Sequence, residues 1–312
     1  MAKFIDNLLS TVTKSMLSRY IAQRQPTQLK IEDFSLWAKT FGSNYHPLFV
    51  TPNNSNNIVL SCHGIEYTNI HDKTNKISYI GLFWIDEKYR GKEIMMHLTK
   101  YAFTNPVYNN PFHSVMKPSV LRCFTIISGD FNEFYKSYES TYHKRELNLC
   151  IPKNDTGIIL KKVSEVPSDL LTSYDQQIFP YNRATYIKDF LEQENCYSRI
   201  ALNSSGEIIG YGNIVLFKST KTAQIQPLYA KNAETARAIL SEILTTENFE
   251  FEELAFRSND RNEESYKWIE PLLINSVNIR RELISTYGYS FHPPKVDLSK
   301  VFAPASTTVC PI

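Results

Sequence analysis

The sequence predicts an α+β, or mixed α/β, fold that is divided into two domains. The chain has 312 residues, enough for two domains of ordinary size that each bury a core. Its first part predicts two helices, then antiparallel strands, then a strand that leads directly into a helix. The order of hairpin, strand and helix returns after residue 157, so we expect two copies of one architecture, each a mostly antiparallel sheet flanked by helices.

The composition is that of a soluble globular protein, with 42% hydrophobic and 21% charged residues. The formal net charge is only +2 and no basic stripe is interleaved with aromatics, so we expect no nucleic-acid partner. No apolar run approaches the roughly 20 residues that span a bilayer. We therefore expect no membrane partner and a cytoplasmic location.

The cysteines and histidines predict no metal site. The five cysteines are odd in number and scattered, without the close spacing of a zinc site or the even count of a disulfide framework. The seven histidines lie far apart in the sequence, without an HxH or HExxH pattern. A reducing compartment agrees with this use of cysteine.

The first domain is predicted to cover residues 1–152. Apolar residues at helical spacing predict one helix from Phe4 to Tyr20 and another around Phe34 to Ala38. Strands are predicted at residues 47–50 and 57–67, separated by the turn-forming TPNNSNN, and a further strand at 120–127.

The central feature of this domain is a strand, a basic turn and a helix. The apolar, aromatic run from Ile77 to Ile85 is too short for an ordinary helix and predicts a buried strand. Helical spacing of apolar residues returns after a polar turn, so a helix begins near Arg90 or Gly91. Its first amides are unpaired and lie at the positive end of the dipole, so this turn is suited to a phosphate group. The alternative is a solvated connection between two core elements.

The segment GLFWIDEKYRGKEIMMHL resembles the signature of the GCN5-related N-acetyltransferase (GNAT) superfamily, a strand followed by Arg/Gln-x-x-Gly-x-Gly/Ala. The resemblance implies that acetyl-CoA is the acyl donor, with its pyrophosphate on the loop amides and its pantetheine arm along the strand. Two positions depart from the pattern, because Glu93 and Met95 stand where the family has small residues. The implied cofactor-binding residues are Phe83, Ile85, Arg90, Gly91, Lys92, Glu93, Ile94 and Met95.

The same resemblance implies a proton donor for the departing thiolate of coenzyme A. In the family this tyrosine lies in a pattern similar to LYEKLGF at the end of a helix, so the resemblance implies a helix within residues 128–149. Phe134, Tyr135 and Lys136 match the first part of the pattern. Tyr135 is therefore the candidate catalytic acid, with Tyr138 as the reserve. The alternative is that both tyrosines are packing surface.

A composition shift at residues 150–157 predicts a linker, followed by a second domain at 158–303 and a tail at 304–312. The second domain is predicted to contain a strand, two helical stretches interrupted by Pro180, a β-hairpin, a strand and a long helix. After residue 249 a strand, a helix at 266–274 and a late strand at 281–287 are expected. The proline-containing end is expected to lie extended over the surface.

This second half resembles the YitH/HolE-type acetyltransferase domain of tandem GNAT proteins, as in nematode proteins of that layout. The matching motifs are YD at Tyr174 and Asp175, IFPYNR ending at Arg183, GEIIGYG and QPLYA. The turn after QPLYA has no Arg-x-x-Gly element, so the cofactor is not expected here. The resemblance implies that this domain closes the acceptor pocket, for which Tyr174, Asp175 and Arg183 are candidates. The alternative is a structural ion pair between Asp175 and Arg183.

These patterns predict an acyl-CoA-dependent N-acyltransferase that transfers an acetyl group directly to an amine on a small molecule or a protein. No residue is selected as the general base, although His63, Glu66 and Glu87 flank the expected cleft. The alternative is a catalytically inactive tandem GNAT protein that acts as a ligand-binding or protein-interaction module, which Glu93 and Met95 favour. The oligomeric state is not predicted.

Overall fold

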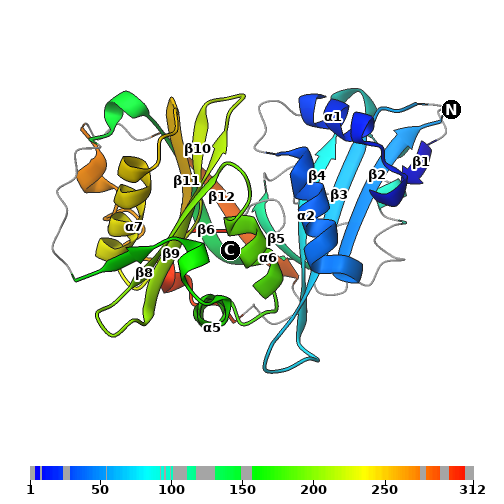
Figure 1. Cartoon of the computed structure of the whole chain (residues 1–312). Coiled ribbons are helices and arrows are strands. Elements are labelled where there is room, and N and C mark those ends of the chain that lie inside the picture. Colours follow the sequence, from blue (N-terminus) through cyan, green and yellow to red (C-terminus); the bar gives the residue numbers. More distant parts are fainter. Residues whose placement is uncertain are drawn as a thin grey trace. The chain divides into compact units, whose positions relative to one another are not determined.

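The computed structural model of the chain divides into two compact units (Figure 1). Unit 1 comprises Met1–Asn132 with Thr286–Pro293, and unit 2 comprises Glu133–Ser285 with Pro294–Ile312. Residues 133–148 therefore belong to unit 2, although they lie before the predicted linker. The structure describes residues 4–7, 9–23, 29–53, 55–91, 93–94, 96–98, 100, 111–116, 131–148, 157–274, 279–288 and 295–305.

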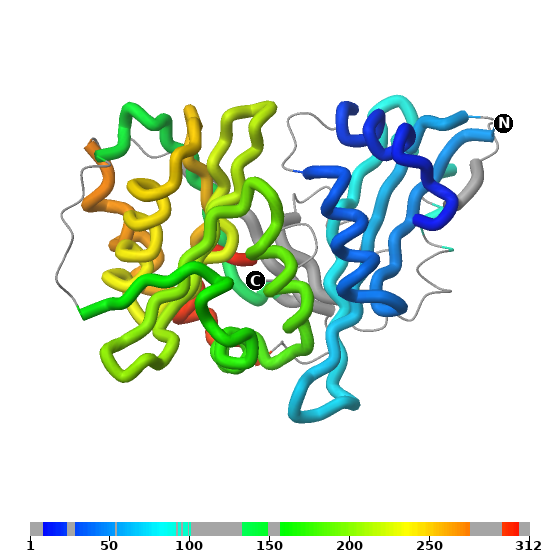
Figure 2. The backbone as a smooth tube through the Cα atoms, in the orientation of Figure 1, coloured from blue at the N-terminus to red at the C-terminus, as the bar shows by residue number. Residues whose placement is uncertain are grey.

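Unit 1 is built on a sheet with the strand order β1-β2-β3-β4-β5. All neighbouring strands are antiparallel except β4 and β5, which are parallel. The backbone can be traced from β2 through β3 to β4 in Figure 2. The helices α1 and α2 cover one face of this sheet (Figure 1). The elements are β1 (Phe4–Asn7), α1 (Lys14–Gln23), α2 (Ile31–Phe41), β2 (Tyr45–Pro52), β3 (Leu60–Thr68), β4 (Lys76–Ile85) and β5 (Pro111–Met116).

Most of the predicted elements of unit 1 are confirmed, but the first helix begins later than predicted. Residues 4–7 form strand β1 on the edge of β2, with Phe4 opposite Pro52, and α1 starts only at Lys14. The available sheet edge outweighs the local helical pattern here. The strand predicted at 120–127 lies outside the described residues.

Unit 2 is built on a sheet with the strand order β12-β6-β11-β10-β9-β8-β7, and a short strand β13 pairs with β10 outside this order. Its strands are β6 (Phe131–His143), β7 (Ile159–Lys161), β8 (Cys196–Leu202), β9 (Ile208–Phe217), β10 (Thr222–Ala230), β11 (Glu253–Asn259), β12 (Ile279–Gly288) and β13 (Val301–Ala303). Its helices are α5 (Ser168–Ile178), α6 (Ala184–Leu191) and α7 (Ala233–Thr246).

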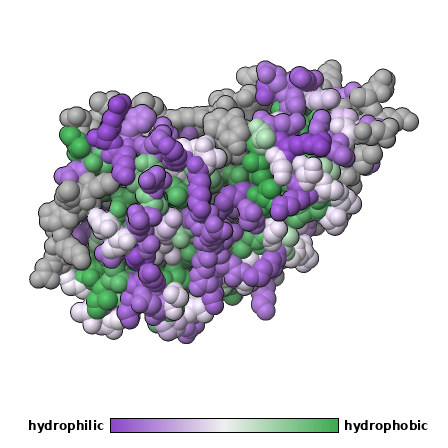
Figure 3. Space-filling view, turned by 45° about the horizontal axis from the view of Figure 1, so that its top comes forward, coloured by the Kyte–Doolittle hydropathy of each residue, from purple (hydrophilic) through white to green (hydrophobic). Residues whose placement is uncertain are grey.

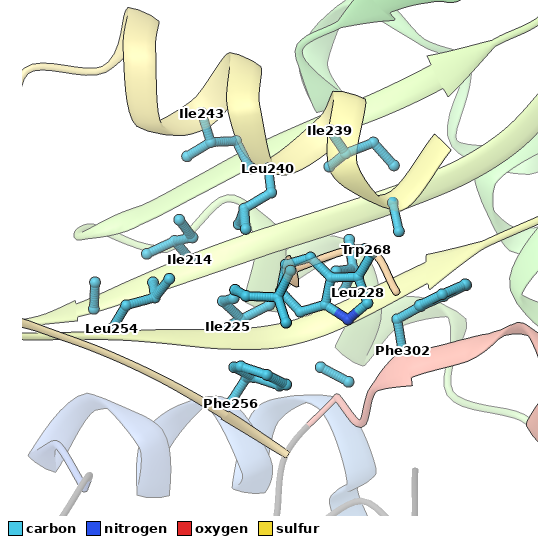
Figure 4. Packing of buried hydrophobic residues seen from close by; sticks show 14 of the residues in the cluster. Ile214, Ile225, Leu228, Ile239, Leu240, Ile243, Leu254, Phe256, Trp268 and Phe302 are labelled. Atoms are coloured by element: carbon cyan, nitrogen blue, oxygen red, sulfur yellow. The ribbon is translucent and has the colours of Figure 1, made fainter. Parts of the chain in front are cut away.

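The side chains of β9 show how unit 2 is layered. A Cβ at Gly210 or Gly212 would lie within 3.1 Å of Ile239, so glycine lets α7 approach this face closely. Tyr211 between them points to the opposite face, where its hydroxyl reaches Asp175 of α5. The core under α7 includes Ile239, Leu240 and Ile243 packed over Ile214, Ile225, Leu254 and Trp268 (Figure 4).

Three predictions for unit 2 are wrong. The segment predicted as a helix at 128–149 contains strand β6, and only a short 3-10 helix (Glu270–Leu272) forms where a helix was predicted at 266–274. Residues 301–303 and 305 are buried instead of lying on the surface. In β6 the aromatic and hydroxyl side chains favour a strand, and β11 supplies its partner, with Tyr142 stacked on Phe256.

Few large apolar side chains are exposed among the described residues. They are Met96, Ile159, Leu170 and Ile274. The face shown in Figure 3 is accordingly covered largely by hydrophilic side chains, with smaller apolar patches between them.

Candidate functional site

The strands β4 and β5 form a fork in the sheet of unit 1. Among the described residues, their parallel pairing covers only Ser78–Ile80 of β4, opposite Pro111–His113 of β5. The pairing with β5 that the structure describes does not extend into the second half of β4, from Gly81 to Ile85. Where two parallel strands diverge, an extended, slender ligand can bind between them through backbone hydrogen bonds, as a peptide does at a sheet edge.

A β-bulge lies in β4 directly after the point where the fork opens. His63 of β3 is opposite Gly81 and Ser61 is opposite Trp84, so Leu82 and Phe83 together face one residue of β3. Leu82 has a φ of +51°, in the left-handed region that a leucine rarely occupies. A bulge interrupts the hydrogen-bond ladder and changes the direction of backbone groups, which is why bulges are frequent next to active sites.

A buried chain of hydroxyl groups holds this bulge in place. The Ser61 hydroxyl donates to the Leu82 carbonyl oxygen at 2.7 Å, and the Tyr20 hydroxyl lies 2.5 Å from Ser61 Oγ. Because Ser61 has a single hydroxyl hydrogen, Tyr20 must be the donor in the second bond. Ser61 and Tyr20 are both fully buried, so these bonds are made away from water, where an unmade bond is costly. The sequence marks Ser61 only as a hydroxyl within an apolar strand.

The turn after β4 brings a cation to the start of the next helix. Asp86 Oδ1 accepts a bond of 3.0 Å from the Lys88 amide and so shapes the turn. The Arg90 side chain, 62% exposed, donates from Nε to the Ile85 carbonyl oxygen at 3.4 Å and lies 3.7 Å from a Glu87 carboxylate oxygen. Its guanidinium therefore retains most of its access to solvent.

The predicted cofactor-binding residues fall on this turn and on the strand before it. Phe83 and Ile85 are half-buried on β4, and Gly91 and Glu93 are exposed. The helix that follows Arg90 packs against the core of the unit through Ile94 and Leu98, which are buried. An accessible cation thus precedes a helix N-terminus, the arrangement that attracts anions. Lys92 and Met95 lie outside the described residues.

The residues considered as a general base are occupied elsewhere or exposed. His63 is buried on β3 among aromatic rings, with Nδ1 2.6 Å from the Tyr45 hydroxyl and its ring centroid 4.8 Å from that of Phe49. Glu66 forms an ion pair of 2.7 Å with Lys76. The Glu87 side chain is exposed at the surface.

Tyr135 and Tyr138 lie on strand β6, within unit 2. Tyr135 is buried, and Tyr138 is half-buried opposite Ser258 of β11. The helix that suggested these tyrosines is absent from the described residues 131–148, so the structural context of the family's pattern is not reproduced. Their role as proton donors stays a prediction.

The structure brings Asp175 and Arg183 together in the core of unit 2. Arg183 Nε and Nη2 donate to the two carboxylate oxygens of Asp175 at 2.9 and 2.8 Å, and the two side chains are 0% and 3% exposed. The Tyr211 hydroxyl donates to the same carboxylate at 2.5 Å, while Arg183 Nη2 donates to the Tyr229 hydroxyl at 3.3 Å. Burial, with the Asp175 charge adding to it, holds the pKa of the Tyr211 phenol well above its usual range.

This cluster contains the ion pair between Asp175 and Arg183 that was the alternative to acceptor binding. Tyr174 lies at its edge, where its hydroxyl donates to the Ile209 carbonyl oxygen at 3.1 Å. The charges of the ion pair are satisfied within the protein, as buried charges must be. A role of Tyr174, Asp175 and Arg183 in acceptor binding stays a prediction.

The described part of the chain contains neither a cluster of metal ligands nor a membrane-spanning helix. No three side chains of His, Cys, Asp or Glu gather closely enough there to hold a metal ion. No helix in the same ranges is both long and apolar enough to cross a bilayer.

Comparison with known proteins adds two family matches. Residues 2–178 match the family described as "Protein of unknown function (DUF1248)", and residues 171–280 match the family described as "Acetyltransferase (GNAT) domain". No curated protein matches the sequence.

Solved structures with the same fold include several acyltransferases of low sequence identity. A Pyrococcus horikoshii protein to which acetyltransferase activity is ascribed is 12% identical, with a TM-score of 0.69 over 98% of this chain and 95% of that one. A tandem GNAT protein from the clavulanic acid biosynthesis pathway is 9% identical, with a TM-score of 0.61 over 92% and 98%. Saccharomyces cerevisiae N-myristoyltransferase, with bound myristoyl-CoA and inhibitors, is 9% identical, with a TM-score of 0.59 over 98% and 87%.

The family match covers more than half of the chain, and the structural matches cover nearly all of it. At such low identity the structural matches establish the fold, which is the two-domain GNAT architecture predicted from the sequence. The chain belongs to the family described as "Protein of unknown function (DUF1248)", and it folds as a tandem of GNAT units, the second of which carries the match to a GNAT acetyltransferase domain.

Proposed function

We propose that this chain is an acyl-CoA-dependent N-acyltransferase that uses acetyl-CoA and transfers its acyl group directly to an amine. The observation that carries the proposal is the fork between β4 and β5, with the bulge at Leu82 where it opens. The GNAT fold and the relatives that are themselves acyltransferases support it.

The residues of unit 1 suit a thioester carrier with an anionic diphosphate. The second half of β4, including Phe83 and Ile85, would offer backbone donors and acceptors to the pantetheine arm where β4 diverges from β5. The turn and helix start, from Arg90 through Gly91, Lys92, Glu93 and Ile94 to Met95, would hold the diphosphate through amides and the Arg90 cation. Acetyl-CoA supplies the activated acyl thioester.

The protein's part in the reaction is to position and to stabilise charge. A backbone N–H that the bulge turns away from the ladder can stabilise negative charge that develops on the carbonyl oxygen during attack by the amine. Tyr135, with Tyr138 as the reserve, would donate a proton to the leaving thiolate. The amine, on a small molecule or a protein, would be received with the help of Tyr174, Asp175 and Arg183.

Titration of acetyl-CoA into the full chain, followed by calorimetry, tests the proposal. We expect saturable binding that is weakened at least tenfold by Arg90→Glu, because the variant places a carboxylate where the diphosphate binds. Lys73→Glu is the matched control. It makes the same charge change at an exposed residue in the turn that precedes β4, at the other end of that strand, and should leave the affinity unchanged. Absence of binding at millimolar acetyl-CoA would overturn the proposal.

A thiol-release assay over a panel of amines then tests catalysis. Release of coenzyme A that depends on the amine supports the transferase. Binding of acetyl-CoA without release, over small amines, amino acids, amino sugars and lysine peptides, would instead support the inactive ligand-binding module.

A further inference from the structure

Unit 2 repeats the fork of unit 1 between its equivalent strands. The parallel pairing of β10 with β11 covers only Thr222–Gln224, opposite Glu253–Ala255. The pairing of β10 with β9 then shifts in register between Ile225 and Leu228, just as the pairing of β4 with β3 shifts at the bulge in unit 1. A polar side chain of the preceding strand again holds the irregular backbone, since Asn213 Nδ2 donates to the Gln226 carbonyl oxygen at 3.1 Å. The second copy therefore retains the geometry of an open fork.

The fork of unit 2 is filled by a later part of the same chain, residues 295–305, here called the β13 segment. Strand β13 pairs antiparallel with the outer half of β10, with Ala303 opposite Leu228 and Val301 opposite Tyr229. From the other side, Asn259 at the end of β11 donates from Nδ2 to the Val301 carbonyl oxygen at 2.7 Å. The β13 segment is thus bonded to both arms of the fork.

Further polar contacts hold the segment along its length. Asn262 Nδ2 donates to the Val301 carbonyl oxygen at 3.2 Å, so this one carbonyl accepts from two buried amides. The Asp297 amide donates to the Ile178 carbonyl oxygen at the end of α5, at 2.9 Å. Recognition is therefore made largely through the segment's backbone, as in the addition of a peptide strand to a sheet edge.

The apolar side chains of the segment are packed into the core. Val301, Phe302, Ala303 and Ala305 are at most 1% exposed. Phe302 and Ala303 belong to the main hydrophobic cluster of unit 2, and Figure 4 shows Phe302 beside Leu228 and Trp268. The two alanines and the aromatic ring form the buried side of an extended peptide. In the binding of a peptide strand to a sheet edge, the pockets that receive such side chains give the specificity.

The helix that follows the fork in unit 2 is also closed by the chain itself. Glu264 Oε2 accepts a bond of 2.8 Å from the Ala233 amide at the start of α7, and Asn232 Oδ1 accepts from the Thr235 amide at 2.9 Å. In unit 1 the corresponding helix start follows the exposed Arg90, whereas here a carboxylate occupies the position that would attract an anion. An anionic diphosphate would meet a like charge at this point.

We infer that the fork of unit 2 is a peptide-binding site whose ligand is the β13 segment of the same chain, and that this segment takes the place a thioester carrier would need. The site selects an extended peptide with small and aromatic apolar side chains and one carbonyl placed between two asparagine amides. This inference rests on contacts within unit 2 alone and does not depend on the function proposed for unit 1.

Cleavage of the folded chain tests the site. A protease recognition sequence is inserted between residues 294 and 295, and the folded full chain is cut and passed through gel filtration. We expect the released piece, residues 295–312, to stay bound to the rest of the chain at micromolar concentration. We also expect a labelled synthetic peptide of residues 295–305 to exchange into the cut protein. Separation of the segment from the cut chain would overturn the inference.

Two variants and one competitor make the test specific. Asn259→Ala removes a buried donor to the Val301 carbonyl, so we expect the labelled peptide to bind about tenfold more weakly. Asn248→Ala, at an exposed position after α7, is the matched control and should not change the affinity. Acetyl-CoA in millimolar excess should not displace the labelled peptide. Displacement by acetyl-CoA, or equal affinity in the Asn259 variant, would contradict the assignment, whether or not unit 1 binds a cofactor.

Discussion

The hydroxyl group of Ser61 donates a hydrogen bond of 2.7 Å to the carbonyl oxygen of Leu82. Among the described residues of unit 1, Leu82 is the one residue other than glycine that has a positive φ. A leucine in this conformation costs free energy of order 1 kcal/mol or more and persists only when its surroundings hold it. The bond from Ser61, itself bonded to Tyr20, supplies that support. The bulge at the mouth of the fork is therefore maintained by residues of α1 and β3.

Ser61→Ala should destabilise the protein by about 1–3 kcal/mol, because the Leu82 carbonyl and the Tyr20 hydroxyl both lose a buried partner. Tyr20→Phe removes only the second bond and should cost less. Urea unfolding of both variants and of the double variant measures the coupling between the two hydroxyls. Additive effects would contradict the chain of bonds.

The Asp33 carboxyl should make stability depend on pH. Burial raises its pKa from 3.8 to about 6, while Lys30 opposes the rise through its charge and through its amide, which donates to Asp33 Oδ2 at 2.7 Å. The folded chain then holds this proton more tightly than the unfolded chain does. The protonated Asp33 carboxyl therefore contributes roughly 3 kcal/mol to the free energy of unfolding. This contribution is present in full below about pH 4 and is lost as the pH rises through 6.

Asp33→Asn removes this dependence. The unfolding free energy of the variant, relative to that of the parent, should therefore increase by roughly 3 kcal/mol between pH 3 and pH 7. Urea unfolding at several pH values measures the difference. Ser35→Ala, which removes no titrating group from an exposed position of the same helix, is the control and should differ from the parent by a constant amount. A constant difference between parent and Asp33→Asn across this range would contradict the raised pKa.

Asp175→Asn should destabilise the protein by about 3–5 kcal/mol, because it leaves the buried Arg183 guanidinium without its counter-charge. The double variant Asp175→Leu with Arg183→Met removes both charges and should cost less than the single change. Chemical unfolding of the three proteins decides this. If the single variant were as stable as the parent, the ion pair would have no structural role and acceptor binding would be its better explanation.

Tyr135→Phe should lower kcat by about 100-fold if Tyr135 protonates the leaving thiolate, since a positioned general acid contributes at least that factor. The affinity for acetyl-CoA should be unchanged, because the proton transfer is part of the chemical step. Tyr138→Phe is compared on the same strand, and a loss of kcat in that variant alone would assign the proton transfer to the reserve donor. A Tyr135→Phe variant with full kcat would remove this residue from the mechanism.

Elements with strong local patterns could be predicted from the sequence. The turn at TPNNSNN, the hairpin around Asn203–Gly206 and the periodic helix α7 each carry their signal within a few residues. The strand and helix on either side of Arg90 also follow from local periodicity. The fold class followed because two copies of one element order can be recognised without knowing their contacts.

Features that depend on distant partners could not be predicted. Strand β6 forms because β11, more than 100 residues later, pairs with it, as Ser137 opposite Asn259 shows. The β13 segment lies in a proline-containing C-terminal stretch, which predicts a surface location, while the fork that receives the segment cannot be recognised from the sequence. The support of Leu82 by Ser61 likewise joins residues whose relation appears only when β3 and β4 pair.

The central claim is that unit 1 has an open fork and unit 2 a filled one. The stoichiometry of acetyl-CoA binding to the intact chain, measured by calorimetry with protein far above the dissociation constant, tests it most directly. We predict one acetyl-CoA per chain, with an affinity that is at least tenfold weaker in Arg90→Glu and unchanged in Lys73→Glu. Two bound molecules would contradict the filled fork of unit 2, and none would contradict the open fork of unit 1.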